Sequence, residues 1–354
     1  MLAALPKLAD KAFILGFFLP TLLFVLVVAQ LFYDQQWAKT LLAVASQKDG
    51  WDSLAYFGVA VWGCSVLLMM FNLMQFQFLE GYLWPISKLS FLRRREDERY
   101  QRDNDRITQL IARQTLADQF TKDEASELVR LQWELLRKFP PDEGDRLPTS
   151  IGNAIRAFEV YSSKVYGADS IPLWLHLSTV IPKGYQSSLD DARAQVNCAV
   201  NACFFAFAIS IAAAACFIAS FDLKSLSKTY PTFTAMLPLL HSSGFRFLSW
   251  AVGAGIVCRA AYLFSLELVY AWGDLVKAAF DCYLPDLAKK MGFELPETAK
   301  ERQEFWDAVT QQAMYWDPLE PKDWKPPAKQ PPPDDPPGLI DQFAKLLTSI
   351  IRDK

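Results

Sequence analysis

The sequence predicts an all-α integral membrane protein with four transmembrane helices and cytoplasmic helical extensions. Three observations support this fold class: four long apolar stretches, polar segments of helical periodicity between and after them, and an uneven distribution of basic residues. Of the 354 residues, 52% are hydrophobic and 21% are charged. This composition is too apolar for an ordinary soluble protein and too charged for a chain that lies entirely in lipid.

The four apolar stretches form two predicted hairpins. The first transmembrane hairpin covers residues 1–79, with spans at 12–32 and 54–79, and the second covers 197–270, with spans at 197–220 and 247–270. Each stretch reaches the roughly 20 residues that a hydrocarbon core requires. The first stretch could also be a signal peptide cleaved after Ala29, but its apolar run is longer than that of most signal peptides. We therefore expect a retained anchor.

Basic residues predict the orientation, because cytoplasmic flanks are enriched in Lys and Arg. Twelve basic residues flank the spans on the side of the long central loop, against five in the two opposite loops. The twelve are Lys7, Lys11, Lys88, Arg93, Arg94, Arg95, Arg99, Lys183, Arg193, Lys277, Lys289 and Lys290, and the five are Lys39, Lys48, Lys224, Lys228 and Arg246. Both termini are therefore expected in the cytoplasm, and the localisation expected is the bacterial inner (plasma) membrane.

Residues 80–196 have the composition of a cytoplasmic helical domain. Two neighbouring segments, 104–120 and 121–139, carry apolar residues at helical spacing, and Thr121 with Glu124 forms a predicted capping box. Ser150 can cap the next helix, and Gly167 is expected to end it. The apolar stretch 171–182 is too short to span a membrane, so we expect it at the membrane surface or packed beneath the domain.

Cytoplasmic helices are also predicted at 271–316. The period of the fourth span continues to Pro285, and a further helix is expected to carry Pro296 in its first turn. Residues 317–337 form a proline-rich linker, and 338–354 form a C-terminal amphipathic helix. A tethered amphipathic helix requires a surface, which can belong to this protein or a neighbouring subunit, to another protein, or to the membrane.

Catalytic signatures are missing from the sequence. It contains no P-loop, nucleophile elbow, zinc-protease motif or dinucleotide fingerprint, and its six cysteines show no metal-binding spacing. No basic and aromatic surface suggests nucleic acid. We therefore expect a non-enzymatic protein without cofactor or metal, whose partners are the lipid bilayer and further copies of itself.

Residues 146–182 resemble a segment of an uncharacterised bacterial integral-membrane protein family. The shared pattern is LPT, two residues, GN, RA, an acidic residue, YG-x-D and a Trp before a proline. It falls here on Leu147, Pro148, Thr149, Gly152, Asn153, Arg156, Ala157, Glu159, Tyr166, Gly167, Asp169 and Trp174. The resemblance covers about a tenth of the chain. It implies a bacterial origin and a membrane setting, and no activity.

Two interpretations of this segment follow from its chemistry. Gly152 and Asn153 lie in the first turn of a predicted helix, whose free N–H groups can bind an anion with help from Arg156. Alternatively, Gly152 permits close helix packing while Arg156 pairs with Glu159 at i+3. Packing is the simpler interpretation.

Charged residues inside the fourth span raise the question of function. At 100° per residue, Glu267, Tyr270, Asp274, Lys277 and Asp281 all fall within about a quarter of the helix circumference from Arg259. A charge near the bilayer centre costs about 2.5–3.5 kcal/mol, so Arg259 should face protein or water, with Glu267 helping to neutralise it. Contact between the two would need a neighbouring span, a subunit or a water molecule.

Polar amides occur at a similar depth in two other spans. Asn72 and Gln75 lie near the inner end of the second span, and Asn197 and Asn201 lie at the start of the third. Together with Arg259, Glu267 and Tyr270 they form a predicted polar intramembrane cluster.

Two functional classes follow from this cluster. In the first, a homo-oligomer has a channel-like or membrane-permeabilising role and is gated by its cytoplasmic helices. In the second, the protein is a membrane-anchored scaffold or adaptor that recruits partners through its cytoplasmic domain and tail helix. We expect the first.

Overall fold

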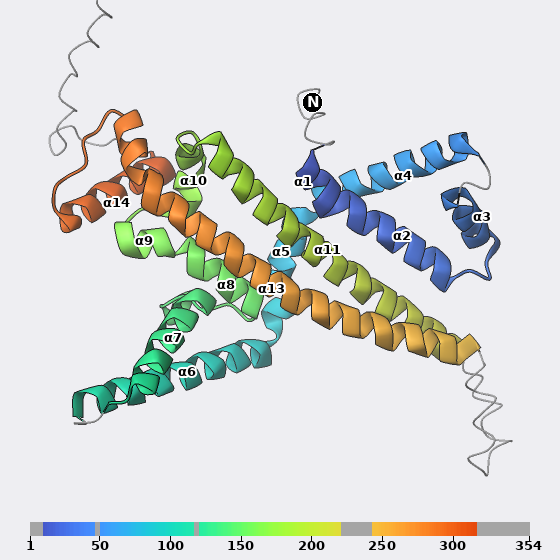
Figure 1. Cartoon of the computed structure of the whole chain (residues 1–354), viewed down its shortest axis with the longest axis horizontal. Coiled ribbons are helices and arrows are strands. Elements are labelled where there is room, and N and C mark those ends of the chain that lie inside the picture. Colours follow the sequence, from blue (N-terminus) through green and yellow to red (C-terminus); the bar gives the residue numbers. More distant parts are fainter. Residues whose placement is uncertain (1–9, 47–49, 117–119, 221–242, 317–354) are drawn as a thin grey trace, which may run out of the picture. The chain divides into compact units, whose positions relative to one another are not determined.

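The computed structural model describes residues 10–46, 50–116, 120–220 and 243–316 (Figure 1). Every regular element within these ranges is a helix, which confirms the all-α prediction. Four helices are long and apolar enough to cross a membrane: Lys11–Leu31, Trp51–Met70, Lys183–Ser220 and Gly244–Lys290. The predicted linker 317–337 and amphipathic helix 338–354 lie outside the described residues.

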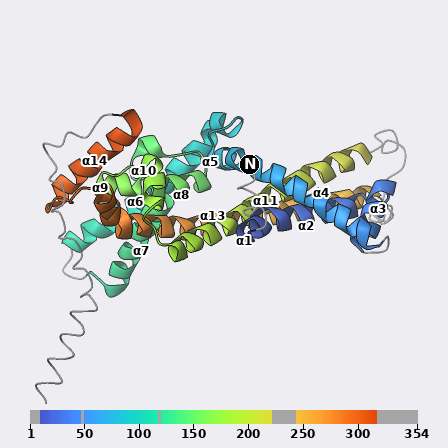
Figure 2. The same ribbon diagram turned by 90° about the horizontal axis from the view of Figure 1, so that it is seen from above.

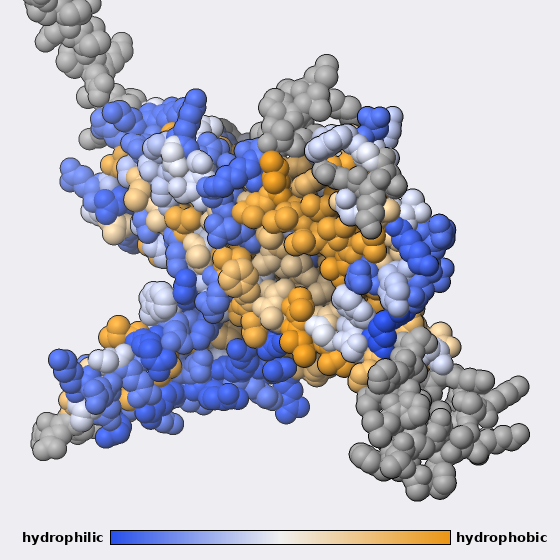
Figure 3. All heavy atoms as spheres, turned by 45° about the vertical axis from the view of Figure 1, so that its right-hand side comes forward, coloured by the Kyte–Doolittle hydropathy of each residue, from blue (hydrophilic) through white to orange (hydrophobic). Residues whose placement is uncertain are grey.

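Two compact units make up the chain, and neither is a contiguous segment. The first contains residues up to Ser162 and Ile181–Ala279, and the second contains Ser163–Val180 and the residues from Phe280 onward. All four apolar helices have their spanning portions in the first unit. Figure 3 shows a broad apolar surface. Exposed apolar residues of the first unit include Leu23, Val59, Phe207 and Val252.

The first span is not a uniform α-helix. It consists of α1 (Lys11–Phe13), a π-helix η2 (Ile14–Phe18) and α2 (Leu19–Leu31), and Asp10 caps its start by accepting a hydrogen bond from the backbone N–H of Lys11. A further short helix, α3 (Gln36–Ala45), precedes the second span, where the sequence predicted a loop.

The second span ends earlier than predicted. Helix α4 (Trp51–Met70) stops at Phe71, and a separate helix α5 (Asn72–Glu80) leaves in another direction (Figure 1). The single helix predicted over 54–79 is therefore wrong. The sequence around Phe71 contains no proline or glycine, so only the packing of α5 on later parts of the chain reveals the break.

A helical hairpin consists of α6 (Ser90–Leu116) and α7 (Lys122–Lys138). Thr121 and Glu124 form the predicted capping box at the start of α7. The core between the two helices contains Ile107, Leu110, Leu128, Leu135 and Phe139. The guanidinium of Arg106 on α6 also donates two hydrogen bonds, each 2.9 Å long, to the carboxylate of Glu127 on α7. The pair is thus held by apolar packing and by a bidentate ion pair.

The first unit also contains α8 (Ser150–Glu159), α11 (Lys183–Ser220) and the part of α13 (Ser243–Lys290) up to Ala279. The last two lie side by side: the Ser210 hydroxyl donates to the Ala251 carbonyl at 2.8 Å, and the Cys203 and Cys258 sulfurs are 3.7 Å apart (Figures 1 and 2). Small residues at the crossing permit this close approach.

Helices α10 (Ser170–Ser178) and α14 (Ala299–Tyr315) pack together in the second unit. Leu173 and Leu177 of α10 are fully buried, so the short apolar stretch 171–182 is used in packing. Gly167 has φ +77°, and a Cβ there would lie 2.4 Å from the Gln303 carbonyl oxygen, so this position requires glycine.

Two details of the last helices differ from the predictions. Helix α13 continues past Pro285 to Lys290, whereas the apolar period of the fourth span predicted a helix only as far as Pro285. Helix α14 begins after Thr298, whose side chain accepts a hydrogen bond from the Glu301 N–H, so Pro296 precedes the helix instead of lying in its first turn.

Candidate functional site

Four buried amides from α5 and α11 form the centre of the candidate site. The Asn72 side chain donates to Asn197 Oδ1 at 3.3 Å, and Gln75 Nε2 donates to Asn201 Oδ1 at 2.9 Å. These residues are at most 9% exposed. The structure thus brings together the four amides that the sequence placed at a similar depth on two different spans.

The amide network extends to the first span. Pro20 has no backbone N–H and cannot donate to the carbonyl of Gly16, four residues earlier. Asn201 Nδ2 donates to that carbonyl oxygen at 2.7 Å. Gly16 lies in the π-helix, and a Cβ there would be 3.2 Å from the Asn197 Cβ. A carbonyl freed by proline is therefore satisfied by a side chain of another span.

A cavity of about 690 Å³ opens next to these amides. We call it the boundary cavity, because it lies between the amides and the polar ends of several helices. Asn72 and Asn197 line it, together with carboxyl groups, one guanidinium and several apolar side chains. The remaining lining residues are Asp10, Ala12, Phe13, Phe17, Met69, Met70, Leu73, Phe76, Glu80, Ile155, Glu159, Asp190, Arg193, Ala194 and Trp272.

Glu80 is the most perturbed acid of the boundary cavity. Burial and, to a smaller extent, the neighbouring carboxylate of Glu159 together raise the pKa of its carboxyl group to about 7. Glu159 itself lies 3.5 Å from the guanidinium of Arg156. The cavity therefore contains a carboxyl group that changes charge near neutral pH.

The segment from Leu147 to Gly152 holds the end of α5 in place. The Thr149 hydroxyl donates to the Leu79 carbonyl and accepts from the Gly152 N–H. A Cβ on Gly152 would lie 2.5 Å from the Glu80 carbonyl oxygen, so only glycine fits this contact. On the facing chain, a Cβ on Gly81 would lie 2.3 Å from Pro148 Cγ.

Asn153 and Arg156 complete this clamp. Asn153 is fully buried, and its side chain accepts from the Leu147 N–H at 2.7 Å and donates to the Leu147 carbonyl at 3.0 Å. The Arg156 guanidinium pairs with Asp145 at 2.7 Å as well as with Glu159. Packing contacts thus account for Gly152, Asn153 and Arg156 individually.

Arg259 and Glu267 are not brought together. Both side chains are exposed, and no ion pair joins them in the part of the chain that the structure describes. The Arg259 guanidinium lies 5.7 Å from the centre of the Tyr262 ring, and neither charged residue has a hydrogen bond to the four amides among the described residues. The predicted cluster is therefore divided into a buried amide group and an exposed charged pair.

The charged and polar face of α13 that runs from Arg259 to Asp281 is called the α13 stripe. Helix α7 covers the part of this stripe that contains Tyr270 and Asp274. Arg137 donates to the Asp274 carboxylate at 2.8 Å, and its guanidinium lies 5.0 Å from the centre of the Tyr270 ring. Tyr270 is only 7% exposed. This portion of the stripe binds α7 instead of facing open solvent, and the residue spacing alone could not distinguish the two.

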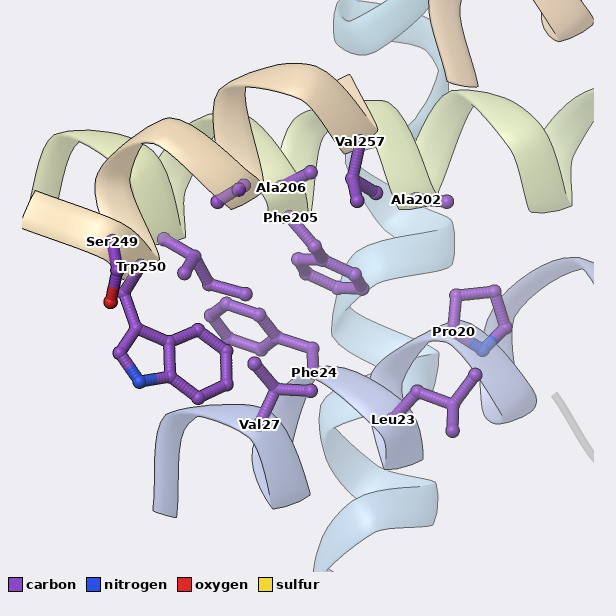
Figure 4. Close-up of a pocket in the computed structure, with 13 residues that line it drawn as sticks. Pro20, Leu23, Phe24, Val27, Ala202, Phe205, Ala206, Ser249, Trp250 and Val257 are labelled. Atoms are coloured by element: carbon purple, nitrogen blue, oxygen red, sulfur yellow. The ribbon is translucent and has the colours of Figure 1, made fainter. Parts of the chain in front are cut away.

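A second cavity, about 550 Å³ in volume, lies between α2, α11 and α13 (Figure 4). Its side chains include Leu23, Phe24, Phe205, Trp250 and Val257, and its wall is almost entirely apolar. No charged residue lines this second cavity, whereas carboxyl groups and a guanidinium line the boundary cavity.

Glu80, Glu159, Arg193 and Pro20 were missed as site residues by sequence reasoning. For Pro20 a signal was present, since a proline inside an apolar span frees a carbonyl that requires another donor. For Glu80 and Glu159 no local signal existed, because they are far apart in sequence and meet only through the contact of α5 with α8.

Comparisons with known protein families, curated proteins and solved structures found no match to this chain. Within the described ranges, no three His, Cys, Asp or Glu side chains are grouped as metal ligands would be.

Proposed function

We propose that this protein is a non-enzymatic, homo-oligomeric membrane protein with a channel-like or membrane-permeabilising role. The exposed position of Arg259 carries the proposal. It lies between Arg246 and Glu267 in an apolar helix, about 20 Å and 12 Å from them along the axis at 1.5 Å per residue. Since a charge facing lipid there costs about 2.5–3.5 kcal/mol, a second copy or a water-filled path should cover it.

The cytoplasmic helices are suited to gate such a path. Arg137 of α7 is bound to Asp274 on the same helix that carries Arg259. The clamp from Leu147 to Gly152 holds α5, whose amides bond to α11. A displacement of α7 or α8 would therefore be transmitted to α13 or to the amide network.

The bacterial inner membrane is the proposed location, with both termini and residues 80–196 in the cytoplasm. The support for this orientation is the excess of basic residues around the central loop. The proposed partners are the lipid bilayer, further copies of this chain and a protein surface for the C-terminal helix.

A scaffold or adaptor is the second candidate, because α7 carries an apolar face outside its hairpin core. Val129, Trp133 and Leu136 are 66%, 56% and 62% exposed, and they lie on neighbouring turns of a helix. Exposed apolar groups at such spacing are typical of a helix that binds another protein.

A measurement of the oligomeric state shows whether the protein is a monomer or a homo-oligomer. The protein is purified in a maltoside detergent, and its protein mass is measured by size-exclusion chromatography with light scattering. The proposal predicts one oligomer of defined size for the wild-type protein. A monodisperse monomer in detergent and in lipid nanodiscs would remove the homo-oligomeric channel.

A further inference from the structure

The boundary cavity combines two kinds of wall that seldom occur together. Its apolar wall includes the rings of Phe13, Phe17, Phe76 and Trp272 and the side chains of Met69, Met70 and Leu73. Its polar wall contains four carboxyl groups, Asp10, Glu80, Glu159 and Asp190, against the single guanidinium of Arg193. A ligand that fills this volume must therefore present both apolar surface and positive charge.

Two polar groups of the cavity can accept further hydrogen bonds. Glu80 forms no hydrogen bond or ion pair among the described residues, and it is half-buried. Asn72 is 9% exposed and uses its NH₂ group on Asn197, while its carbonyl oxygen accepts no hydrogen bond in the described part of the chain. The Asn72 oxygen lines the cavity, so it can accept a hydrogen bond from a molecule bound there.

The charge balance distinguishes these groups from an ordinary solvated surface. Arg156 is shared between Asp145 and Glu159, and Lys11 is bound to Asp191, outside the cavity lining. Arg193 is exposed and is the only basic residue of the lining. The lining thus places four carboxyl groups and one guanidinium beside aromatic rings, and ring faces attract cations.

We propose that the boundary cavity binds an organic cation with an apolar body, held by Glu80 and Glu159 and packed against the aromatic wall. A bare metal ion would not use the phenylalanine and methionine side chains. A neutral apolar molecule would leave the Glu80 carboxyl group and the Asn72 oxygen without a partner from the ligand. The volume of about 690 Å³ lies within the range of small-molecule sites.

Two sources could supply this chemistry, namely a membrane lipid with an ammonium headgroup and a free lipophilic amine. Both present a positive charge joined to an apolar body. The proposal does not depend on oligomerisation or conduction, because binding to the boundary cavity can be measured on a monomer or an oligomer.

Equilibrium binding of tetraphenylphosphonium to the full-length protein in maltoside detergent at pH 8 tests the proposal. Tetraphenylborate, which has nearly the same shape and the opposite charge, is the matched ligand. We expect saturable binding of the cation and at least tenfold weaker binding of the anion. Glu80→Gln should weaken cation binding by about tenfold, a 1.4 kcal/mol change, while Glu143→Gln on an exposed turn outside the cavity should not alter it.

Further variants address the position of the ligand. Leu73→Trp fills part of the cavity and should also reduce cation binding without changing the detergent-solubilised fold, as followed by circular dichroism. Displacement of the cation by phosphatidylethanolamine but not by phosphatidylglycerol would identify a lipid headgroup as the source, and retention with both lipids would identify a free amine. Equal binding of cation and anion, or full cation binding by both Glu80→Gln and Leu73→Trp, would overturn the proposal.

Discussion

The side-chain amide of Asn201 donates a 2.7 Å hydrogen bond to the backbone carbonyl of Gly16, four residues before Pro20. The proline removes the backbone donor that an α-helix would supply at this point, and α11 replaces it from outside the helix. In a membrane, where water cannot satisfy a free carbonyl, this contact joins the first and third spans.

Asn201→Leu should therefore destabilise the protein by about 1–3 kcal/mol, since it leaves the Gly16 carbonyl and the Gln75 amide without their partner. The free energy of unfolding can be measured by denaturation in mixed micelles. Pro20→Ala restores a backbone donor, so the cost of Asn201→Leu should be smaller in that background. An equal cost with and without Pro20 would show that the proline plays no part.

Gly152→Ala should be strongly destabilising, because its Cβ would lie 2.5 Å from the Glu80 carbonyl oxygen and 2.9 Å from the Glu80 Cα. Overpacking of this kind costs about 1–3 kcal/mol. Gly184→Ala is the matched control, because a Cβ there meets nothing within 4 Å. Thermal unfolding of both variants in detergent checks the difference, and similar melting temperatures would contradict the close contact of α5 with α8.

Glu80 should make stability fall as the pH rises. Burial and the Glu159 carboxylate on α8 raise its pKa from 4.5 to about 7 in the folded protein. Asp10, Asp190 and Arg193 are the other charged groups lining the cavity around it. The folded state therefore holds the proton more tightly, and the associated stability is complete below about pH 4.5 and lost as the pH rises through about 7.

Glu80→Gln imitates the protonated carboxyl group and removes this dependence. Its melting temperature should match that of the wild type at pH 5 and exceed it at pH 8.5. A difference of the same size at both pH values would show that Glu80 titrates normally.

Helix content and span positions followed from sequence, because long apolar runs and capping residues such as Thr121 are local signals. The sequence also grouped Asn72, Gln75, Asn197 and Asn201, and the structure joins them by hydrogen bonds. The break at Phe71 could not be predicted, since no proline or glycine marks it, and helix α5 beyond it packs on α8, about 70 residues away along the chain. Local periodicity contains no information on such contacts.

The α13 stripe shows the same limit for the candidate site. Helical geometry correctly places Tyr270 and Asp274 on one side of the helix, but it does not say what covers them. Arg137 covers them. From the sequence, this residue could be placed only near the end of the helix expected in segment 121–139. The raised pKa of Glu80 likewise arises from a long-range contact.

Labelling of single cysteines in a cysteine-free background tests the orientation. Ser46→Cys follows α3 and should react with a membrane-impermeant maleimide on intact cells, because its loop is expected outside. Gln101→Cys on α6 should react only after lysis. Labelling of Gln101→Cys on intact cells would invert the proposed topology.

Planar-bilayer recording of the purified wild-type oligomer tests the central claim most directly. We predict discrete currents whose amplitude or ion selectivity changes in Arg259→Leu, while the oligomer size is retained and the charge-matched control Arg302→Leu, exposed on α14, behaves as wild type. An assembled wild-type oligomer that carries no current at either polarity, with monovalent, divalent and organic ions supplied in turn, would contradict the channel-like role and favour the scaffold.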